Sequence, residues 1–197
     1  MCGILITVGE NKEAINSISH RGIEYNTLEL DGVYLTHHRL PIQTLDGDEW
    51  SQPIEITKGV YMMFNGEIFN YDKNLYSSDS EYLSNLFRKY DGENIQMFSS
   101  LYLPYINTWD GFWAIVIYNS KSGRITAFTD PLGKKLLYMN SSGEICSEIK
   151  GLVRSNSSID RTYISSVRKW GYNKDTRTPY LDIKRIQPNS IIQYDSP

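Results

Sequence analysis

The sequence predicts an α+β domain in which antiparallel sheets pack together and helices cover them from outside. The chain has 197 residues, 40% of them hydrophobic and 22% charged, which is enough to build a core without disulfide bonds. Short apolar segments separated by turn residues fill much of the chain, as expected for antiparallel strands. Two further segments place apolar residues at helical spacing. No internal repeat or linker divides the chain, so we expect one domain over residues 1–197.

The N-terminal half begins with a strand and a short helix. GILITV, residues 3–8, is rich in β-branched residues and ends at a glycine, which is typical of a buried strand. Asn11 is a suitable N-cap for a helix that runs to about residue 19. Strands are then predicted over residues 33–40 and 59–71, the second of them broken at Asn65-Gly66.

The next element is a helix over residues 80–90. Its apolar side chains recur at helical spacing, Ser78 or Asp79 is a natural N-cap, and Asp91-Gly92 ends it. Four strands at hairpin spacing follow and predict a meander, over residues 111–119, 124–130, 136–140 and 144–149. A helix is expected within residues 159–172, and a last strand within residues 186–194.

Composition excludes several classes of function. The net charge is −3 and lysine and arginine form no cluster beyond pairs, so direct binding of nucleic acid is not expected. The N-terminus lacks a basic region of the kind that begins a signal peptide, and no apolar run approaches the roughly 20 residues that span a bilayer, which favours a cytoplasmic protein without membrane contact. In that compartment the two cysteines are expected to remain unpaired, and Cys146, in an alternating segment, is expected in the core.

Cys2 is the first candidate for chemistry. If Met1 is removed, Cys2 carries a thiol and a free α-amino group on one residue, which supplies a nucleophile and a general base together. The ordinary pKa of an α-amino group is about 7.7–8.0 and that of a thiol about 8.5, so the amine can accept the proton of the thiol near neutral pH. A cysteine at position 2 taken alone is more often incidental, so its meaning depends on the rest of the chain.

Asn65-Gly66 is the second candidate, with two interpretations. The pair is typical of a tight hairpin turn. Alternatively, the asparagine amide and the glycine N–H form an oxyanion hole for acyl transfer, where the missing Cβ lets the substrate approach the backbone.

Arg39 and Asp79 are candidates for binding a zwitterion. Arg39 is either a solvated residue at a strand end or the partner of a carboxylate, which an arginine binds through two hydrogen bonds. Asp79 is either a helix cap or the partner of an ammonium group. His37 and His38 are neighbours on a predicted strand and therefore point to opposite faces, which argues against one shared metal ion. A nucleophile, an oxyanion hole and a pair of charges for an amino acid together fit glutamine.

The chain resembles the glutaminase domain of class II glutamine amidotransferases, above all that of glutamine-dependent asparagine synthetases. The matching segments extend over nearly the whole chain: MCGI, SHRG, HHRL with PIQ, FNGEIFNY, SDSE, WDGFWAIVIYN, TDPLGKKLLYM, CSEIKGL and QPNSI. The resemblance implies the four-layer αββα sandwich of two antiparallel sheets found in N-terminal nucleophile hydrolases.

The same resemblance implies the site. Cys2 would be the nucleophile after loss of Met1, and Asn65 with Gly66 the oxyanion hole. Arg39 would bind the α-carboxylate of glutamine, and Glu67 and Asp79 would face its α-amino group. Leu40, Pro41, Ile42 and Gln43 would line the same pocket, and no metal or cofactor would be needed.

Three departures from the family pattern are visible. Ile23 stands where the family has proline, Thr129 stands where it has arginine, and the segment 94–109 is longer than usual. The asparagine synthetases continue into an ATP-binding synthetase domain that has no counterpart here. The sequence therefore predicts a glutaminase subunit that supplies ammonia to a separately encoded ATP-dependent synthetase.

Two other functions remain open at this level. The chain could be a catalytically idle module of the same fold that binds or regulates a synthetase. It could also be an N-terminal nucleophile hydrolase for another amide, although a site with Arg39 and Asp79 is suited to a zwitterion rather than to such substrates.

Overall fold

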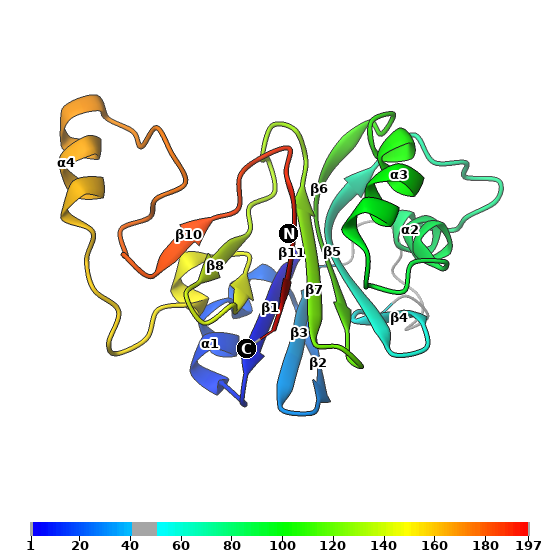
Figure 1. Cartoon of the computed structure of the whole chain (residues 1–197), viewed down its shortest axis with the longest axis horizontal. Helices are drawn as coiled ribbons and strands as arrows, with labels where there is room; N and C mark the ends of the chain where they lie inside the picture. The colour runs from blue at the N-terminus through cyan, green and yellow to red at the C-terminus, as the bar shows by residue number, and fades with distance from the viewer. Residues whose placement is uncertain (1, 41–50, 197) are drawn as a thin grey trace.

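Two antiparallel sheets packed face to face form the centre of the molecule (Figure 1). The computed structural model describes residues 2–40 and 51–196. The first sheet, here sheet A, has the spatial order β10 (Ile183–Arg185), β8 (Tyr138–Asn140), β9 (Ile145–Cys146), β1 (Gly3–Val8), β3 (Val33–Arg39), β2 (Glu24–Leu30). The second, sheet B, has the order β11 (Ile191–Asp195), β7 (Arg124–Thr129), β6 (Gly111–Asn119), β5 (Val60–Ile68), β4 (Ile54–Thr57).

Helices cover the outer faces of both sheets. The short helix α1 (Lys12–Ser17) packs outside sheet A, and α2 (Asp79–Phe87) and α3 (Ile95–Ile106) pack outside sheet B (Figure 1). Side chains alternate between the two faces of each strand, so one face of each sheet contributes to the core between the sheets and the other to a core under helices. The predicted αββα sandwich is therefore confirmed.

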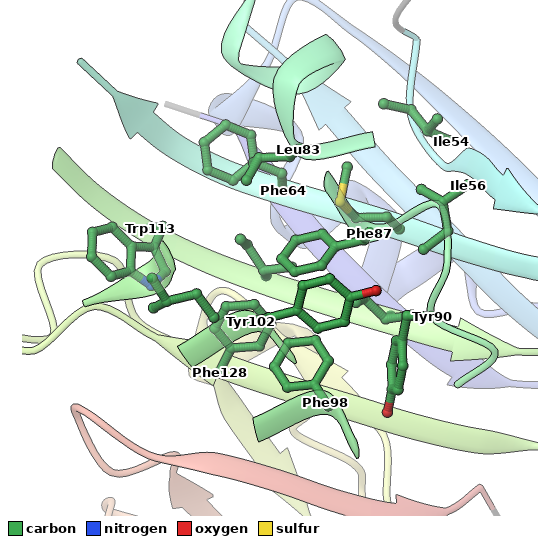
Figure 2. Close-up of a cluster of buried hydrophobic side chains, with 14 of the residues drawn as sticks. Ile54, Ile56, Phe64, Leu83, Phe87, Tyr90, Phe98, Tyr102, Trp113 and Phe128 are labelled. Carbon is green, nitrogen blue, oxygen red and sulfur yellow. The ribbon is translucent and has the colours of Figure 1, made fainter. Parts of the chain in front are cut away.

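The largest aromatic cluster joins α2 and α3 to sheet B (Figure 2). Phe87, Tyr90 and Phe98 are fully buried, and the rings of Tyr102 and Phe128 lie 5.0 Å and 5.3 Å from that of Phe98. Because aromatic side chains bury large apolar areas, this cluster fixes both helices on the sheet.

The structure confirms most predicted elements. β1, α1 with its N-cap Asn11, β3 and β11 lie where the sequence places them. The helix predicted within 159–172 is α4 (Arg161–Trp170). It ends at Gly171 and buries none of its side chains, and Figure 1 shows it away from the sheets.

Two of the predicted elements are wrong. β5 runs without interruption from Val60 to Ile68 and pairs with β6 throughout, so Asn65-Gly66 is not a turn. The predicted meander is also divided, because β6 and β7 belong to sheet B whereas β8 and β9 form a hairpin in sheet A. The segment after Asp130, whose carboxylate accepts the N–H groups of Leu132, Lys134 and Lys135, carries the chain between the sheets.

The second helix is also shorter than predicted. Ser78 is its N-cap, accepting the N–H of Glu81, but the helix ends at Phe87, before Tyr90. Across residues 2–40 and 51–196, no helix is long and apolar enough to cross a membrane.

Candidate active site

Cys2 lies immediately before β1 and next to the end of β3. Its carbonyl oxygen accepts a hydrogen bond from Arg21 Nε at 2.8 Å, and the backbone N–H of Leu40 donates to Sγ at 3.5 Å. The residue is partly exposed and its thiol is free. The sulfur is thus held in a defined place but remains within reach of a small molecule.

Arg21 connects Cys2 to a second charged group. Its Nη1 donates to Glu148 Oε1 at 2.8 Å, and His20 Nε2 lies at the same distance from that oxygen. Burial raises the pKa of Glu148, but hydrogen bonds from Arg21, His20 and Lys150 outweigh it and leave the pKa below its usual value. A Cβ at Gly3 would lie 3.1 Å from Arg21 Cδ, so a glycine after Cys2 lets the arginine pack across the strand.

A cavity of about 490 Å³ opens beside Arg21, lined on one side by Lys134 and Lys135. The ammonium groups of these lysines lie 5.8 Å and 4.6 Å from the centre of the Phe112 ring. Burial and the charge of Arg21 lower the pKa of Lys135. The surroundings of Cys2 on this side are therefore basic.

Asn65 and Glu67 share the face of β5 that looks toward sheet A. Met63, on the same face, packs in the core between the sheets, and strand alternation places Asn65 and Glu67 with it. Asn65 is 1% exposed, and its Nδ2 has no acceptor among the residues described. A buried amide without an acceptor is a hydrogen-bond donor available to a ligand.

The N–H of Gly66 points to the edge of β5 away from β6. The N–H of the odd-numbered residue Phe69 donates to Asp110 O on the β6 side. The N–H groups of the even-numbered residues Phe64 and Ile68 donate to side chains on the opposite side. Since backbone groups alternate along a strand, Gly66 N–H shares the edge of Phe64 and Ile68.

Strand β6 gives a second reason for glycine at position 66, beside the predicted approach of a substrate. A Cβ there would lie 2.1 Å from Phe112 O and 2.8 Å from Trp113 Cα, which are backbone atoms of β6. The close packing of β6 therefore requires a residue without a side chain here, whether or not a ligand also approaches this backbone.

Arg39 lies at the end of β3 and pairs with Glu24, its register partner on β2. Its Nη1 is 2.9 Å from Glu24 Oε1, and its side chain is 18% exposed. Gly22 makes this arrangement possible, because a Cβ at Gly22 would lie 2.6 Å from the Arg39 backbone. Of the remaining residues predicted to line the pocket, Leu40 contacts Cys2, and Pro41, Ile42 and Gln43 lie outside the described residues.

Asp79 is the first residue of α2 and lies against the end of β5. It is 7% exposed, and its Oδ2 accepts the N–H of Ile68 at 3.2 Å. Burial above all, together with the charge of Glu67, raises its pKa to about 6 against the lowering effect of its hydrogen bonds. A carboxylate in this position gains stability from a nearby ammonium group.

His37 and His38 do point to opposite faces. His37 Nε2 lies 3.2 Å from Phe64 O, inside the molecule, and burial lowers its pKa to about 3. The ring of His38 lies 5.2 Å from that of Tyr25. The two imidazoles therefore have separate structural partners.

Sequence reasoning missed Gln52. Its Oε1 accepts the N–H of Phe64 at 2.5 Å, and the side chain is 6% exposed. The local sequence gives no sign of this role, which arises only when the segment before β4 passes the edge of β5.

The predicted residues thus form two groups, one around Cys2 at the ends of β1 and β3 and one along the edge of β5. The contact between His37 and Phe64 joins the two groups, because His37 is the register partner of Ile4 on β1.

Comparison with known proteins identifies relatives of this chain. The profile of the family described as "Glutamine amidotransferase domain" matches residues 1–197. "Asparagine synthetase [glutamine-hydrolyzing] 1" of Saccharomyces cerevisiae is 31% identical in an alignment 198 residues long that covers 90% of this chain and 32% of the yeast protein. "Asparagine synthetase [glutamine-hydrolyzing] 3" of Arabidopsis thaliana is 29% identical over 77% of this chain and 28% of its own length. The chain therefore spans about a third of the length of these relatives.

Solved structures share the fold at lower identity. Glutamine phosphoribosylpyrophosphate amidotransferase from B. subtilis covers 99% of this chain with a TM-score of 0.63 and 16% identity, and 47% of its own chain is matched. A structure described as the allosteric regulatory enzyme of purine biosynthesis gives a TM-score of 0.66 at 15% identity, again over 99% of this chain and 47% of the other.

Proposed function

Because this chain belongs to the family of glutamine amidotransferase domains, we propose that it hydrolyses L-glutamine to glutamate and ammonia through a thioester on Cys2. The observation that supports the proposal most directly is the buried Asn65 amide, which has no acceptor among the described residues and shares β5 with the edge-facing N–H of Gly66. Two donors of this kind suit the oxygen of a tetrahedral intermediate.

The proposed reaction assigns one role to each group. The Cys2 sulfur attacks the side-chain amide carbon of glutamine, and Asn65 and Gly66 stabilise the oxyanion. When the carbon–nitrogen bond breaks, the α-amino group of Cys2 gives the proton it took from the thiol to the leaving ammonia. Water then hydrolyses the thioester to glutamate, so no cofactor is required.

Charged residues are proposed to hold the rest of the substrate. Arg39 binds the α-carboxylate, sharing its guanidinium with Glu24, while Asp79 and Glu67 face the α-amino group. The buried carboxyl of Asp79 gains a partner for its charge when glutamine binds.

Two cysteine variants test the chemistry. Cys2→Ala should abolish release of glutamate and ammonia, whereas Cys146→Ala should keep turnover. Cys146 is the matched control because it is fully buried and burial raises its thiol pKa to about 12. Mass spectrometry should find Met1 removed and one glutamine-derived adduct on Cys2.

Specific results would contradict the proposal. Retention of Met1 on essentially every molecule would remove the α-amine from the site. Glutamine binding without turnover in the processed protein would instead favour an idle module that regulates a synthetase.

We also propose that the ammonia reaches an ATP-dependent amidating enzyme encoded as a separate chain. Ammonia is mostly protonated at neutral pH and is then a poor nucleophile, so an acceptor site close to its release is an advantage. The names of the relatives, which pair glutamine hydrolysis with synthesis, support this class of partner. A cytoplasmic setting, where thiols stay reduced, suits Cys2.

Purification from the natural source tests the partner separately from the chemistry. We expect the protein to co-purify with a second, ATP-binding chain that accelerates glutamine hydrolysis. Finding both activities on one longer polypeptide, or fast hydrolysis that no partner changes, would overturn a separate chain and leave the Cys2 mechanism standing.

A further inference from the structure

Strand β5 has an open edge beside the proposed oxyanion hole. On one side it pairs with β6 from Val60 to Ile68, but on the other side β4 pairs with it only as far as Met62. Beyond Met62, the even-numbered residues of β5 therefore direct their backbone groups to an edge where no described strand lies. The Gly66 N–H belongs to this edge.

Side chains take the place of a neighbouring strand along this edge. Phe64 N–H donates to Gln52 Oε1 at 2.5 Å, His37 Nε2 lies 3.2 Å from Phe64 O, and Ile68 N–H donates to Asp79 Oδ2 at 3.2 Å. All three side chains are at least nine-tenths buried. The backbone is thus held at Phe64 and at Ile68, on either side of Gly66.

The hydrogen bond of His37 determines its chemical state. A carbonyl oxygen only accepts, so Nε2 carries the hydrogen and Nδ1, which is buried and without a partner in the described chain, carries none. This neutral histidine therefore acts as a hydrogen-bond donor to the backbone of β5.

We propose that Gln52 and His37 are positioning residues for the oxyanion hole. They hold the N–H and C=O groups of Phe64, and so fix the directions of the Asn65 side-chain amide and of the Gly66 backbone N–H. The inference rests on the proposed function. Donors that are fixed before the reaction stabilise a developing negative charge without reorganising, whereas an edge strand with unpaired backbone groups would have to be ordered at each turnover.

The contacts explain why two residues are needed. Gln52 accepts from the N–H of Phe64 and His37 donates to its C=O, so together they satisfy the residue as a paired strand would. His37 belongs to β3 of sheet A, next to the strand that follows Cys2. The same contact therefore sets the position of the oxyanion strand relative to the nucleophile.

Gln52→Met and His37→Leu remove the hydrogen bonds but keep a similar volume. We expect each to lower kcat for glutamine by about 10- to 100-fold, less than the loss of an oxyanion donor itself. KM should change by less than about threefold, because neither residue contacts the substrate. His37→Gln, whose Nε2 can still donate to Phe64 O, should recover most of kcat.

Two ligands separate positioning from general damage. An analogue of glutamate with an aldehyde in place of the side-chain carboxylate adds to the Cys2 thiol and places an oxygen in the oxyanion hole. Glutamate itself binds without forming a tetrahedral centre. Both variants should bind the aldehyde about 10- to 100-fold more weakly and glutamate normally. Equal losses for the two ligands, or none for the aldehyde, would overturn the proposal.

The matched control is Gln193→Met. Gln193, on β11, donates to Tyr90 Oη and to Thr126 Oγ1 of β7, and the strands β7 and β6 separate it from β5. It should lower the melting temperature and leave kcat unchanged.

Amide hydrogen exchange gives a readout that needs no turnover and still applies if His37→Leu does not fold. In Gln52→Met the amide of Phe64, which loses its acceptor, should exchange at least tenfold faster, with those of β7 unchanged. Unchanged exchange would contradict the inference even if the wild type proved inactive on glutamine.

Discussion

The ionised carboxylate of Asp79 is expected to favour glutamine binding but to lower the stability of the folded chain. An aspartate has an ordinary pKa of 3.8, whereas burial raises that of Asp79 to about 6 in the folded chain. The folded state therefore binds the proton more tightly than the unfolded state does. This contribution to stability is fully present below pH 3.8 and is lost as pH rises through 6, a change of about 3 kcal/mol.

Asp79→Asn should therefore raise the melting temperature above pH 6 by several degrees, because it removes the cost of burying an ionised carboxylate. The same change should weaken glutamine binding about 10- to 100-fold by removing the partner of the substrate ammonium. Thermal melts at pH 5 and 7.5, with glutamine titrations, measure both effects. A variant less stable than wild type at pH 7.5 would contradict the sign.

The pH dependence of glutamine binding gives the companion result. Using Cys2→Ala to prevent turnover, the affinity should fall as pH drops below about 6, by up to tenfold per unit, with proton release on binding at pH 6. Calorimetry in two buffers of different ionisation enthalpy measures that release. In Asp79→Asn both effects should disappear.

Residue types at the site were predictable because each has a distinct chemistry. The sequence identifies Cys2, Arg39, Asn65 and Asp79 as a set that suits glutamine. The structure places Cys2 and Arg39 at strand ends, Asn65 within β5 and Asp79 at the start of α2. Gln52 and Glu24 were not found. Their contacts depend on which segments meet in space, and no local pattern encodes that.

At the scale of helices and strands, pairing with a neighbouring strand can override the local conformational preference of the sequence. Asn-Gly favours a turn, yet β5 continues through it because β6 pairs along its whole length and leaves no room for a side chain at Gly66. β2 was missed because it is an edge strand whose side chains are all exposed or half-buried, so its pattern of polarity is weak. α3 lies in the segment noted as unusually long and contains Pro104, which obscures a helical pattern.

The aromatic cluster under α3 leads to a prediction about that helix. Phe98 is fully buried, with the rings of Tyr90, Tyr102 and Phe128 within 5.3 Å. Phe98→Ala should lower the free energy of unfolding by about 3–5 kcal/mol, through lost burial and the cavity left behind. Urea unfolding measures the loss. Leu101→Ala on the same helix, at a side chain 43% exposed, should cost about 0.5 kcal/mol or less.

The assignment of strands to sheets is a property of the whole molecule that the sequence did not reveal. Hairpin spacing indicated a meander, but the chain leaves sheet B after β7 and enters sheet A at β8. Spacing alone cannot distinguish a hairpin from a crossing of this length. The strand pattern predicts packed sheets with helices outside, whereas the four-layer αββα order is what the family resemblance implies.

The last strand completes sheet B, and its removal should affect the whole fold. β11 pairs with β7 over its full length, and Gln193 donates to Tyr90 Oη in the aromatic cluster. A chain ending at Ser190 should lose cooperative thermal unfolding, as measured by circular dichroism. Gln193→Met, which keeps the strand, should still unfold cooperatively but about 1–2 kcal/mol less stably. An unchanged melting temperature in the shortened chain would show that sheet B does not need this strand.

The position of β1 between β3 and β9 also has a consequence for how the protein is made. β1 begins at Gly3 and β9 at Ile145, so the two neighbours leave the ribosome far apart in time, roughly seven to thirty seconds at ordinary rates of elongation. Throughout that interval the first strand has one of its two partners, and its end stays open to the peptidase that trims the initiator methionine. Glutamine hydrolysis should therefore begin only late in translation, and a nascent chain stalled before residue 145 should be trimmed yet unable to react with glutamine.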